Sequence, residues 1–178
     1  MSIVRHISSR DEASPPADVY DRVMPVAHRH YDAHLTWEGN SGRGSASFLA
    51  YERTFRATVE GKPSLAGSAD PAFRGDGRLL NPEDLFLTAV AACHMLTYLA
   101  LCARRGIVVV AYEDAASGTM RVEASGGRFT EIVLSPKVRL ACRDRAEAAL
   151  TLHEVAHRDC FLASSCSVPI RVHPAVVS

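Results

Sequence analysis

Apolar and polar residues alternate along the first part of the chain, in the pattern of half-buried β-strands. The first predicted strand spans residues 29–37, where every second residue is apolar: Tyr31, Ala33, Leu35 and Trp37. We expect two more short strands, at residues 45–51 and 54–60. Residues 61–80 are rich in Gly, Pro, Ser and Asp, so they predict a long loop.

The most apolar segment of the chain predicts a helix with a well-defined start. Asn81 is a preferred N-cap residue, Pro82 suits the first helical position, and two acidic residues then favour the positive end of the helix dipole. Gly106 is expected to end the helix. Residues 85–103 are almost all apolar and approach the roughly 20 residues that a membrane span needs. Because strand-like segments flank this helix, we expect a buried helix and no membrane partner.

The second half of the chain is β-rich between residues 108 and 142. A second helix is expected from about 144 to 159, and a last strand from 167 to 173. The predicted element order is β-β-β-α-β-β-α-β, which lacks regular βαβ alternation and therefore favours an α+β fold with mainly antiparallel sheets. We expect residues 28–178 to form a single domain and residues 1–27 to be an N-terminal extension with little to pack.

Charge and composition exclude several classes of protein. The chain has 20 basic and 20 acidic residues, so it lacks the basic surface of a nucleic-acid-binding protein. About 47% of its residues are apolar, which is enough for a core. The first 27 residues lack the apolar run of a signal peptide, so we expect a cytoplasmic protein with reduced thiols. Its five cysteines are then not a disulfide framework.

The sequence HEVAH, at residues 153–157, matches the HExxH pattern of zinc hydrolases. On a helix His153 and His157 would share one face, and Glu154 would be the general base. The usual third ligand is missing, because Cys160 and Ala163 stand where the extended motif has glycine and histidine. We therefore expect no metal and no cofactor, and a solvated helix face is the simpler interpretation. A zinc hydrolase remains the remote alternative.

Two segments resemble the OsmC/Ohr family of thiol-dependent hydroperoxide reductases. The first contains NPEDL and then AAC, which ends at Cys93. The second is AHRDC, which ends at Cys160, although Phe161 replaces the proline that often follows. The resemblance covers roughly residues 29–174 and implies the OsmC-like fold, in which sheets surround a long central helix. It also suggests that the HEVAH helix serves to deliver Cys160.

The resemblance implies a two-cysteine peroxidase. Cys93 would attack the peroxide and become a sulfenic acid, and Cys160 would resolve it as a disulfide. A dithiol reductant, of the lipoyl type or a small thiol, would recycle the enzyme. The remaining cysteines are expected to be structural, although Cys166 could compete as a resolving thiol. Apolar residues of the predicted loop favour an organic hydroperoxide over hydrogen peroxide: Leu65, Phe73, Leu79 and Leu80.

The family also uses an arginine that is held by the glutamate of the first motif, here Glu83. Arg74 is our choice for this arginine, and Arg43 is the alternative. Glu83 and Cys93 are ten residues apart, which is about 15 Å along a straight helix. One arginine cannot contact both residues of the same helix, so we expect an intertwined homodimer whose interface completes the site. A redox sensor or ligand-binding protein of the same fold remains the main alternative function.

Overall fold

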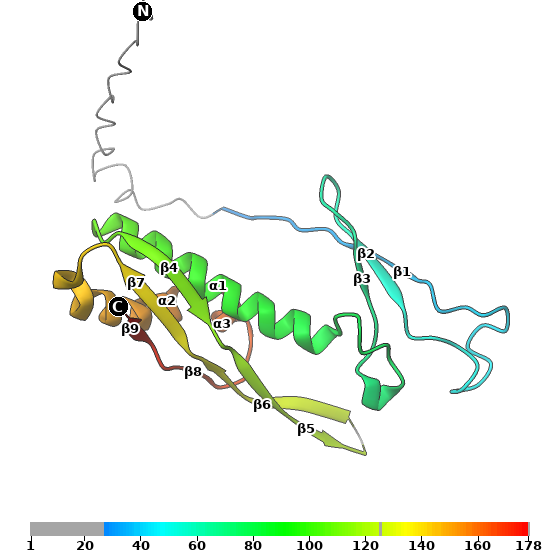
Figure 1. Ribbon diagram of the computed structural model, residues 1–178. Helices are drawn as coiled ribbons and strands as arrows, with labels where there is room; N and C mark the ends of the chain where they lie inside the picture. The colour runs from blue at the N-terminus through cyan, green and yellow to red at the C-terminus, as the bar shows by residue number, and fades with distance from the viewer. Residues whose placement is uncertain (1–26, 125, 178) are drawn as a thin grey trace, which may run out of the picture.

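The structure is a computed structural model that describes residues 27–124 and 126–177. Helix α1 (Pro82–Arg104) is its longest element, with a small sheet beyond its N-terminal end and the other strands along its length (Figure 1). The architecture is α+β, as predicted. Four of the six strand pairings are antiparallel, so the sheets are mainly antiparallel. The predicted N-terminal extension lies outside the described residues, except for residue 27.

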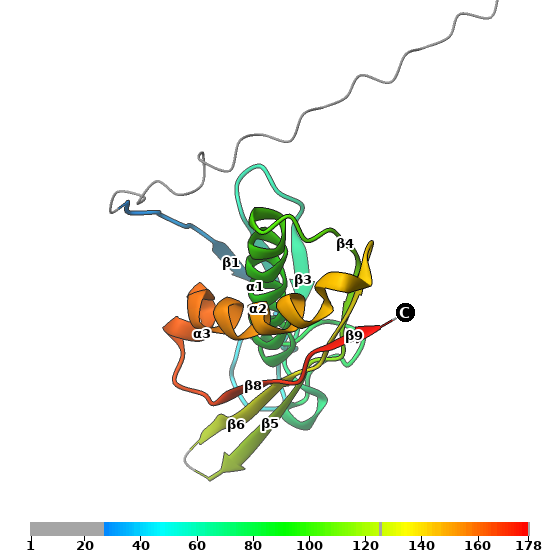
Figure 2. The same ribbon diagram turned by 90° about the vertical axis from the view of Figure 1, so that its left-hand side faces the viewer.

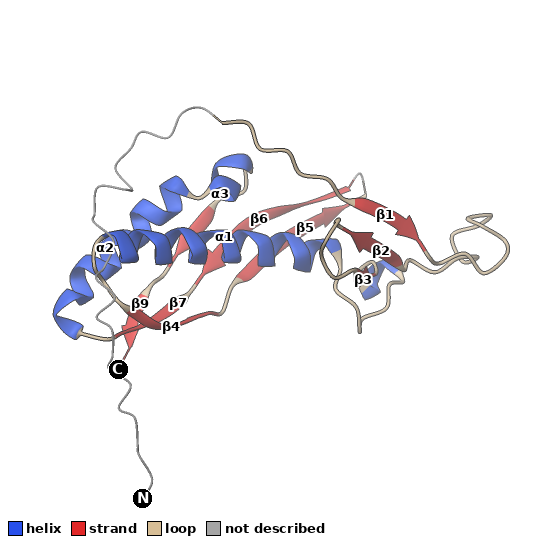
Figure 3. Ribbon diagram, turned by 90° about the horizontal axis from the view of Figure 1, so that it is seen from above, coloured by secondary structure: helices blue, strands red, loops and turns tan. Residues whose placement is uncertain are grey.

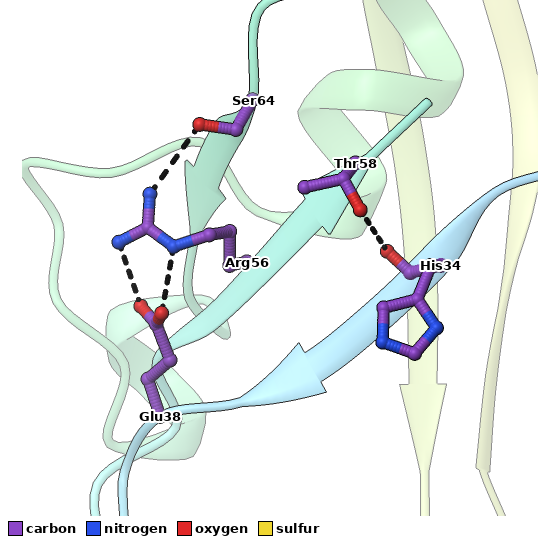
Figure 4. A network of polar contacts seen from close by, with 5 residues as sticks. All are labelled: His34, Glu38, Arg56, Thr58 and Ser64. Atoms are coloured by element: carbon purple, nitrogen blue, oxygen red, sulfur yellow. Dashed lines mark hydrogen bonds and ion pairs between the residues drawn. The ribbon is translucent and has the colours of Figure 1, made fainter. Parts of the chain in front are cut away.

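The small N-terminal sheet has the order β1-β2-β3, with β1 at His34–Trp37, β2 at Phe55–Thr58 and β3 at Leu65–Gly67. Figure 1 and Figure 3 both show this sheet beyond the N-terminal end of α1. Arg56 of β2 forms two hydrogen bonds with Glu38, at 2.7 and 3.1 Å, and so ties the end of β1 to β2 (Figure 4).

The prediction of a strand at residues 45–51 is wrong, because this segment consists of turns and bends. Side chains form hydrogen bonds with backbone groups that a neighbouring strand would otherwise pair with. The Asn40 side chain accepts hydrogen bonds from the N–H groups of Gly42 and Gly44, each at 2.9 Å. The Arg53 guanidinium donates to the carbonyls of Phe48 and Tyr51. The third strand is β3, which lies inside the segment that was predicted to be a loop.

The start and the end of α1 are as the sequence predicts. The Asn81 side chain accepts a hydrogen bond from the Asp84 N–H at 2.7 Å, and the Asp84 carboxylate accepts one from the Asn81 N–H. This reciprocal capping box satisfies two N–H groups that have no partner within the helix. Gly106 follows the last turn with a φ of 64°, which favours glycine.

The remaining strands form two sheets, with the orders β4-β7-β9 and β5-β6-β8. Their bounds are β4 at Val109–Asp114, β5 at Ser117–Glu123, β6 at Gly126–Leu134, β7 at Pro136–Leu140, β8 at Ile170–Val172 and β9 at Ala175–Val177. Four strands therefore separate the helices, and two follow them. The predicted single last strand is only partly right, since the chain leaves one sheet after β8 and joins the other as β9.

The second helix, α2 (Ala146–Asp159), follows a short 3-10 turn and lies across α1 (Figure 2). Cys160 separates it from the five-residue helix α3 (Phe161–Ser165). One core cluster joins the C-terminal half of α1 to α2, β4 and β7. A second cluster, around Val90, Ile132 and Leu134, joins the N-terminal half of α1 to β6 and β8.

A large apolar surface of this chain stays uncovered. Helix α1 is long and apolar enough to cross a membrane by length and composition alone, and only 22% of its apolar window is buried. Leu96 in its middle is 62% exposed. All four residues of β1 are exposed as well. Strands and helices with such faces normally pack against another surface.

Candidate active site

The structure brings Cys93 and Cys160 together. Cys93 lies in the middle of α1 and is half-buried, whereas Cys160 is 1% exposed at the junction of α2 and α3. Both are free thiols. Burial raises the pKa of the Cys160 thiol, and the adjacent Cys93 thiol raises it further. Residues 67 positions apart in sequence thus place two sulfurs side by side, while the roles assigned to them stay predictions.

The short helix α3 fixes the backbone around Cys160. The Ser164 N–H and hydroxyl both donate to the Cys160 carbonyl, at 3.0 and 3.1 Å. The N–H groups of Leu162 and Ala163 lie near the Cys160 sulfur and partly oppose the rise of its pKa. Helix α3 also packs on α1, so the turn after α2 holds Cys160 against the helix that carries Cys93.

Glu83 and the predicted arginines lie elsewhere. Glu83 is half-buried in the first turn of α1 and lines a hollow of about 290 Å³ with Phe73 and Phe129. Arg74 is exposed and has a left-handed backbone with φ 68°, and Arg43 is exposed in the turn that Asn40 organises. Within residues 27–124 and 126–177, no hydrogen bond or ion pair joins either arginine to Glu83 or to the two cysteines.

Arg53 is an arginine of the N-terminal lobe that sequence reasoning did not select. Its guanidinium lies over two aromatic rings, 4.5 Å from the centroid of Phe48 and 4.1 Å from that of Tyr51. Together with its two carbonyl hydrogen bonds, these contacts hold it in one orientation. Its chemistry points to a structural role in the loop.

A buried pair of histidines joins α1 to α2 next to the thiols. His94 follows Cys93, and its Nε2 lies 3.1 Å from Nδ1 of His153. Both residues are 1% exposed. Burial lowers the pKa of His94 to about 4 and that of His153 to about 3, so both rings are neutral at pH 7. The ring of Tyr98 stacks on His153 with a centroid distance of 3.8 Å.

The histidines of HEVAH therefore do not form a solvated face, and that interpretation is wrong for His153. Its Nδ1 faces His94, while Glu154 is exposed and His157 is half-buried. Among the described residues, no group of three or more His, Cys, Asp and Glu side chains is placed to hold a metal ion. Helical spacing showed that His153 and His157 share a face, but it carried no signal that His94, 59 residues away, covers it.

The sequence of this chain matches a known protein family. The model of the OsmC family, described as OsmC-like protein, matches residues 75–173, which is more than half of the chain. This chain belongs to the OsmC-like family. The matched region contains both cysteines, the histidine pair and Glu83. No curated protein matches the sequence significantly.

Solved structures of several OsmC-like proteins and organic hydroperoxide resistance proteins are similar to this chain. An OsmC-like protein of unknown function from Vibrio cholerae has 25% identity and a TM-score of 0.73, covering 83% of this chain and 99% of its own. An organic hydroperoxide resistance protein from Elizabethkingia anophelis has 17% identity and a TM-score of 0.60, with 85% and 98% covered. A putative organic hydroperoxide resistance protein from Vibrio cholerae, with captopril in one of its active sites, has 22% identity and a TM-score of 0.56, with 84% and 93% covered.

Proposed function

We propose that this OsmC-like protein is a thiol-dependent peroxidase that reduces organic hydroperoxides through Cys93 and Cys160. The observation that carries the proposal is the adjacency of these two thiols, one half-buried and one fully buried. Membership of a family that includes organic hydroperoxide resistance proteins supports the same chemistry. The proposed setting is the cytoplasm, where a thiol pair is kept reduced between oxidation events.

In the proposed reaction Cys93 reacts first and Cys160 second. The Cys93 thiolate attacks the distal oxygen of the hydroperoxide, so the O–O bond breaks, the sulfur gains OH and the alkoxide takes up a proton. Cys160 then loses its proton and attacks the Cys93 sulfur, which expels hydroxide as water and forms the disulfide. A dithiol of the lipoyl or small-thiol type supplies two electrons and two protons to restore both thiols.

We assign Cys93 the peroxidatic role because it is the more accessible of the two. Burial raises the pKa of Cys160, and a thiol with a raised pKa is a poor first nucleophile but a sufficient one once a sulfenic acid lies beside it. A cation is needed to stabilise the Cys93 thiolate. Arg74, or alternatively Arg43, would supply it from a second copy of the chain, with Glu83 orienting the guanidinium.

A homodimer accounts for both the missing cation and the uncovered apolar surface. The open face of α1 and the exposed side chains of Leu35 and Trp37 on β1 are apolar surfaces that a second copy could cover, since it offers the same surfaces in return. The hollow beside Glu83 has an apolar part, which includes Phe73 and Phe129, and an acidic part, which includes Asp70 and Asp84. The apolar part would suit the alkyl or aryl group of an organic hydroperoxide.

Peroxide consumption by single-cysteine variants tests the proposal. With an organic hydroperoxide and a dithiol, Cys93→Ser is expected to lose activity to the background, because the attacking sulfur is gone. Cys160→Ser is expected to consume about one equivalent of peroxide and then recycle poorly. The measurement is peroxide remaining over time, with Cys142→Ser, an exposed cysteine, as the matched control. Wild type that stops after one equivalent would indicate a sensor, and an active Cys93→Ser would refute the assignment.

A further inference from the structure

The buried histidines between α1 and α2 have no role in the chemistry described above. His94 and His153 are in direct contact, and His157 lies close enough to lower the pKa of His94. Buried polar atoms are almost always hydrogen-bonded in folded proteins. Among the described residues, three buried ring nitrogens have no hydrogen-bond partner: Nδ1 of His94, Nε2 of His153 and Nδ1 of His157. Three such atoms in one contact between two helices call for a functional explanation.

The two hydrogen-bonded rings of His94 and His153 are arranged so that a proton can pass through them. One hydrogen is shared between Nε2 of His94 and Nδ1 of His153. Whichever ring donates it, one outer nitrogen of the pair is a bare base and the other carries a hydrogen. The outer nitrogens are the unpartnered ones, Nδ1 of His94 and Nε2 of His153. A proton accepted at one end can therefore release another at the opposite end.

One end of this pair lies on the helix segments that carry the thiols. His94 directly follows Cys93 on α1, and His157 precedes Cys160 by three residues, or about one turn of α2. Cys160 lies against Cys93. His94 is therefore the neighbour of one cysteine of the thiol pair, and His157 lies about one helical turn from the other.

The other end belongs to an open hollow of about 500 Å³. It lies between α2 and the connection from β8 to β9, and Glu154, His157 and Pro174 contribute to its wall. His153 also lines it, although its side chain is 1% exposed. Glu154 is exposed, so the hollow communicates with solvent and with a carboxylate that can exchange protons.

We propose that His94, His153 and His157 form a proton relay between the Cys93–Cys160 thiol pair and the hollow beside Glu154. The relay rests on the proposed peroxidase function. It takes the proton that each thiol gives up and returns one to each departing oxygen, first the alkoxide and then the hydroxide. Each turnover moves two protons out and two back, so no charge accumulates in the buried site.

The surroundings of the rings keep the relay neutral. Tyr98 of α1 stacks on His153, and Tyr112 of β4 lies 6.5 Å from it, centroid to centroid. Burial raises the pKa of both phenols well above their usual range, so neither is charged. Asp114 of β4 is held by the Ser135 N–H at 2.7 Å. A neutral imidazole has one donor and one acceptor, which proton transfer through it requires.

The test is the rate at which Cys93 and Cys160 close their disulfide when a diazene oxidant replaces the peroxide. Reduced protein is mixed with the oxidant at pH 7.5, quenched in acid and mapped for the disulfide. His94→Gln and His153→Gln keep a hydrogen-bonding side chain but cannot pass a proton. We expect them to close roughly tenfold more slowly or worse, within the usual range of acid–base contributions.

Tyr98→Phe is the matched control, since it keeps the ring against His153 and should close within about twofold of wild type. Folded glutamine variants that close at the wild-type rate would overturn the relay. A second measurement uses only wild type: closure rates in mixtures of light and heavy water should fall along a curve if several protons move together, and a straight line contradicts the relay. Wild type that closes its disulfide with diazene but never consumes peroxide refutes the peroxidase function instead.

Discussion

Cys102 and Cys160 are both buried, and burial raises the pKa of both thiols, but their neighbours give them different chemistry. Cys160 lies against a second thiol at a helix junction. Cys102 packs in the core cluster of α1 and α2, with the Tyr98 hydroxyl nearby. A buried cysteine with only core neighbours behaves as a small apolar residue.

Replacing Cys102 with alanine should therefore change stability and leave the chemistry alone. The substitution removes one sulfur from a packed core, so we expect the free energy of unfolding to fall by about 1 kcal/mol. Urea unfolding of Cys102→Ala and wild type measures this difference, and initial rates of peroxide consumption measure activity. Cys142→Ala, which changes an exposed residue, should alter neither. A Cys102→Ala protein with the activity of Cys93→Ser would show that the reactive thiol has been misassigned.

Among the elements, those with strong local signals were the ones that sequence predicted well. The cap at Asn81 and the glycine at Gly106 fixed both ends of α1. The segment 45–51 has strand-like alternation, yet the Arg53 guanidinium donates to two of its carbonyls and none of the described strands pairs with it. The step from one sheet to the other after β8 could not be predicted either. The parallel pairing of β8 with β6 and of β9 with β7 depends on tertiary contacts, which leave no local pattern in the sequence.

In the candidate site, too, local sequence signals predicted well and tertiary contacts could not be predicted. Two short motifs located Cys93 and Cys160, because each motif lies on a helix or at its end. The contact between His94 and His153 could not be foreseen, since the helical pattern of one element does not reveal what covers its buried face. The choice of arginine stays a prediction, because several loop arginines precede Glu83 and none of them has a distinguishing local environment in the sequence.

The contact between α1 and α2 makes stability depend on pH. The pKa of His94 is lowered to about 4 and that of His153 to about 3, whereas an unfolded histidine titrates near 6.5. The unfolded chain thus binds more protons between these values. Stability is fully present above pH 6.5 and is lost as the pH falls towards 4. We expect a loss of about 1 to 2 kcal/mol per histidine between pH 7.5 and pH 5.

Urea unfolding curves at several pH values from 7.5 to 5 measure this loss. His153→Gln is the control, because it leaves only one buried imidazole, and its stability should vary less with pH than that of wild type. Most carboxyl groups titrate below this window, so they contribute little to the difference. Equal pH dependence in both proteins would mean that the buried rings are not the titrating groups.

On the scale of the whole molecule, three features of the single chain suit one subunit of a dimer. Its small sheet lies beyond the end of α1, this helix is open along one face, and Glu83, the proposed partner of the arginine, lies about 15 Å along α1 from Cys93. Each feature has the same explanation if α1 packs against α1 of a second copy. The N-terminal half of each chain would then face the thiols of the other.

Subunit complementation tests this arrangement and identifies the arginine. Cys93→Ser and Arg74→Ala should each be nearly inactive as homodimers. In a co-expressed mixture, half of the dimers would be mixed, and each would hold one site with an intact Cys93 and its partner's Arg74. If the arginine acts across the interface, about a quarter of wild-type activity should return. If it acts within its own chain, none should return, because the only intact Cys93 then lies in the chain that lacks Arg74.

Pairing Cys93→Ser with Arg43→Ala runs the same test on the alternative arginine. An Arg74→Ala homodimer with full activity would exclude Arg74, and a monomeric wild type that still turns over would exclude the shared site altogether.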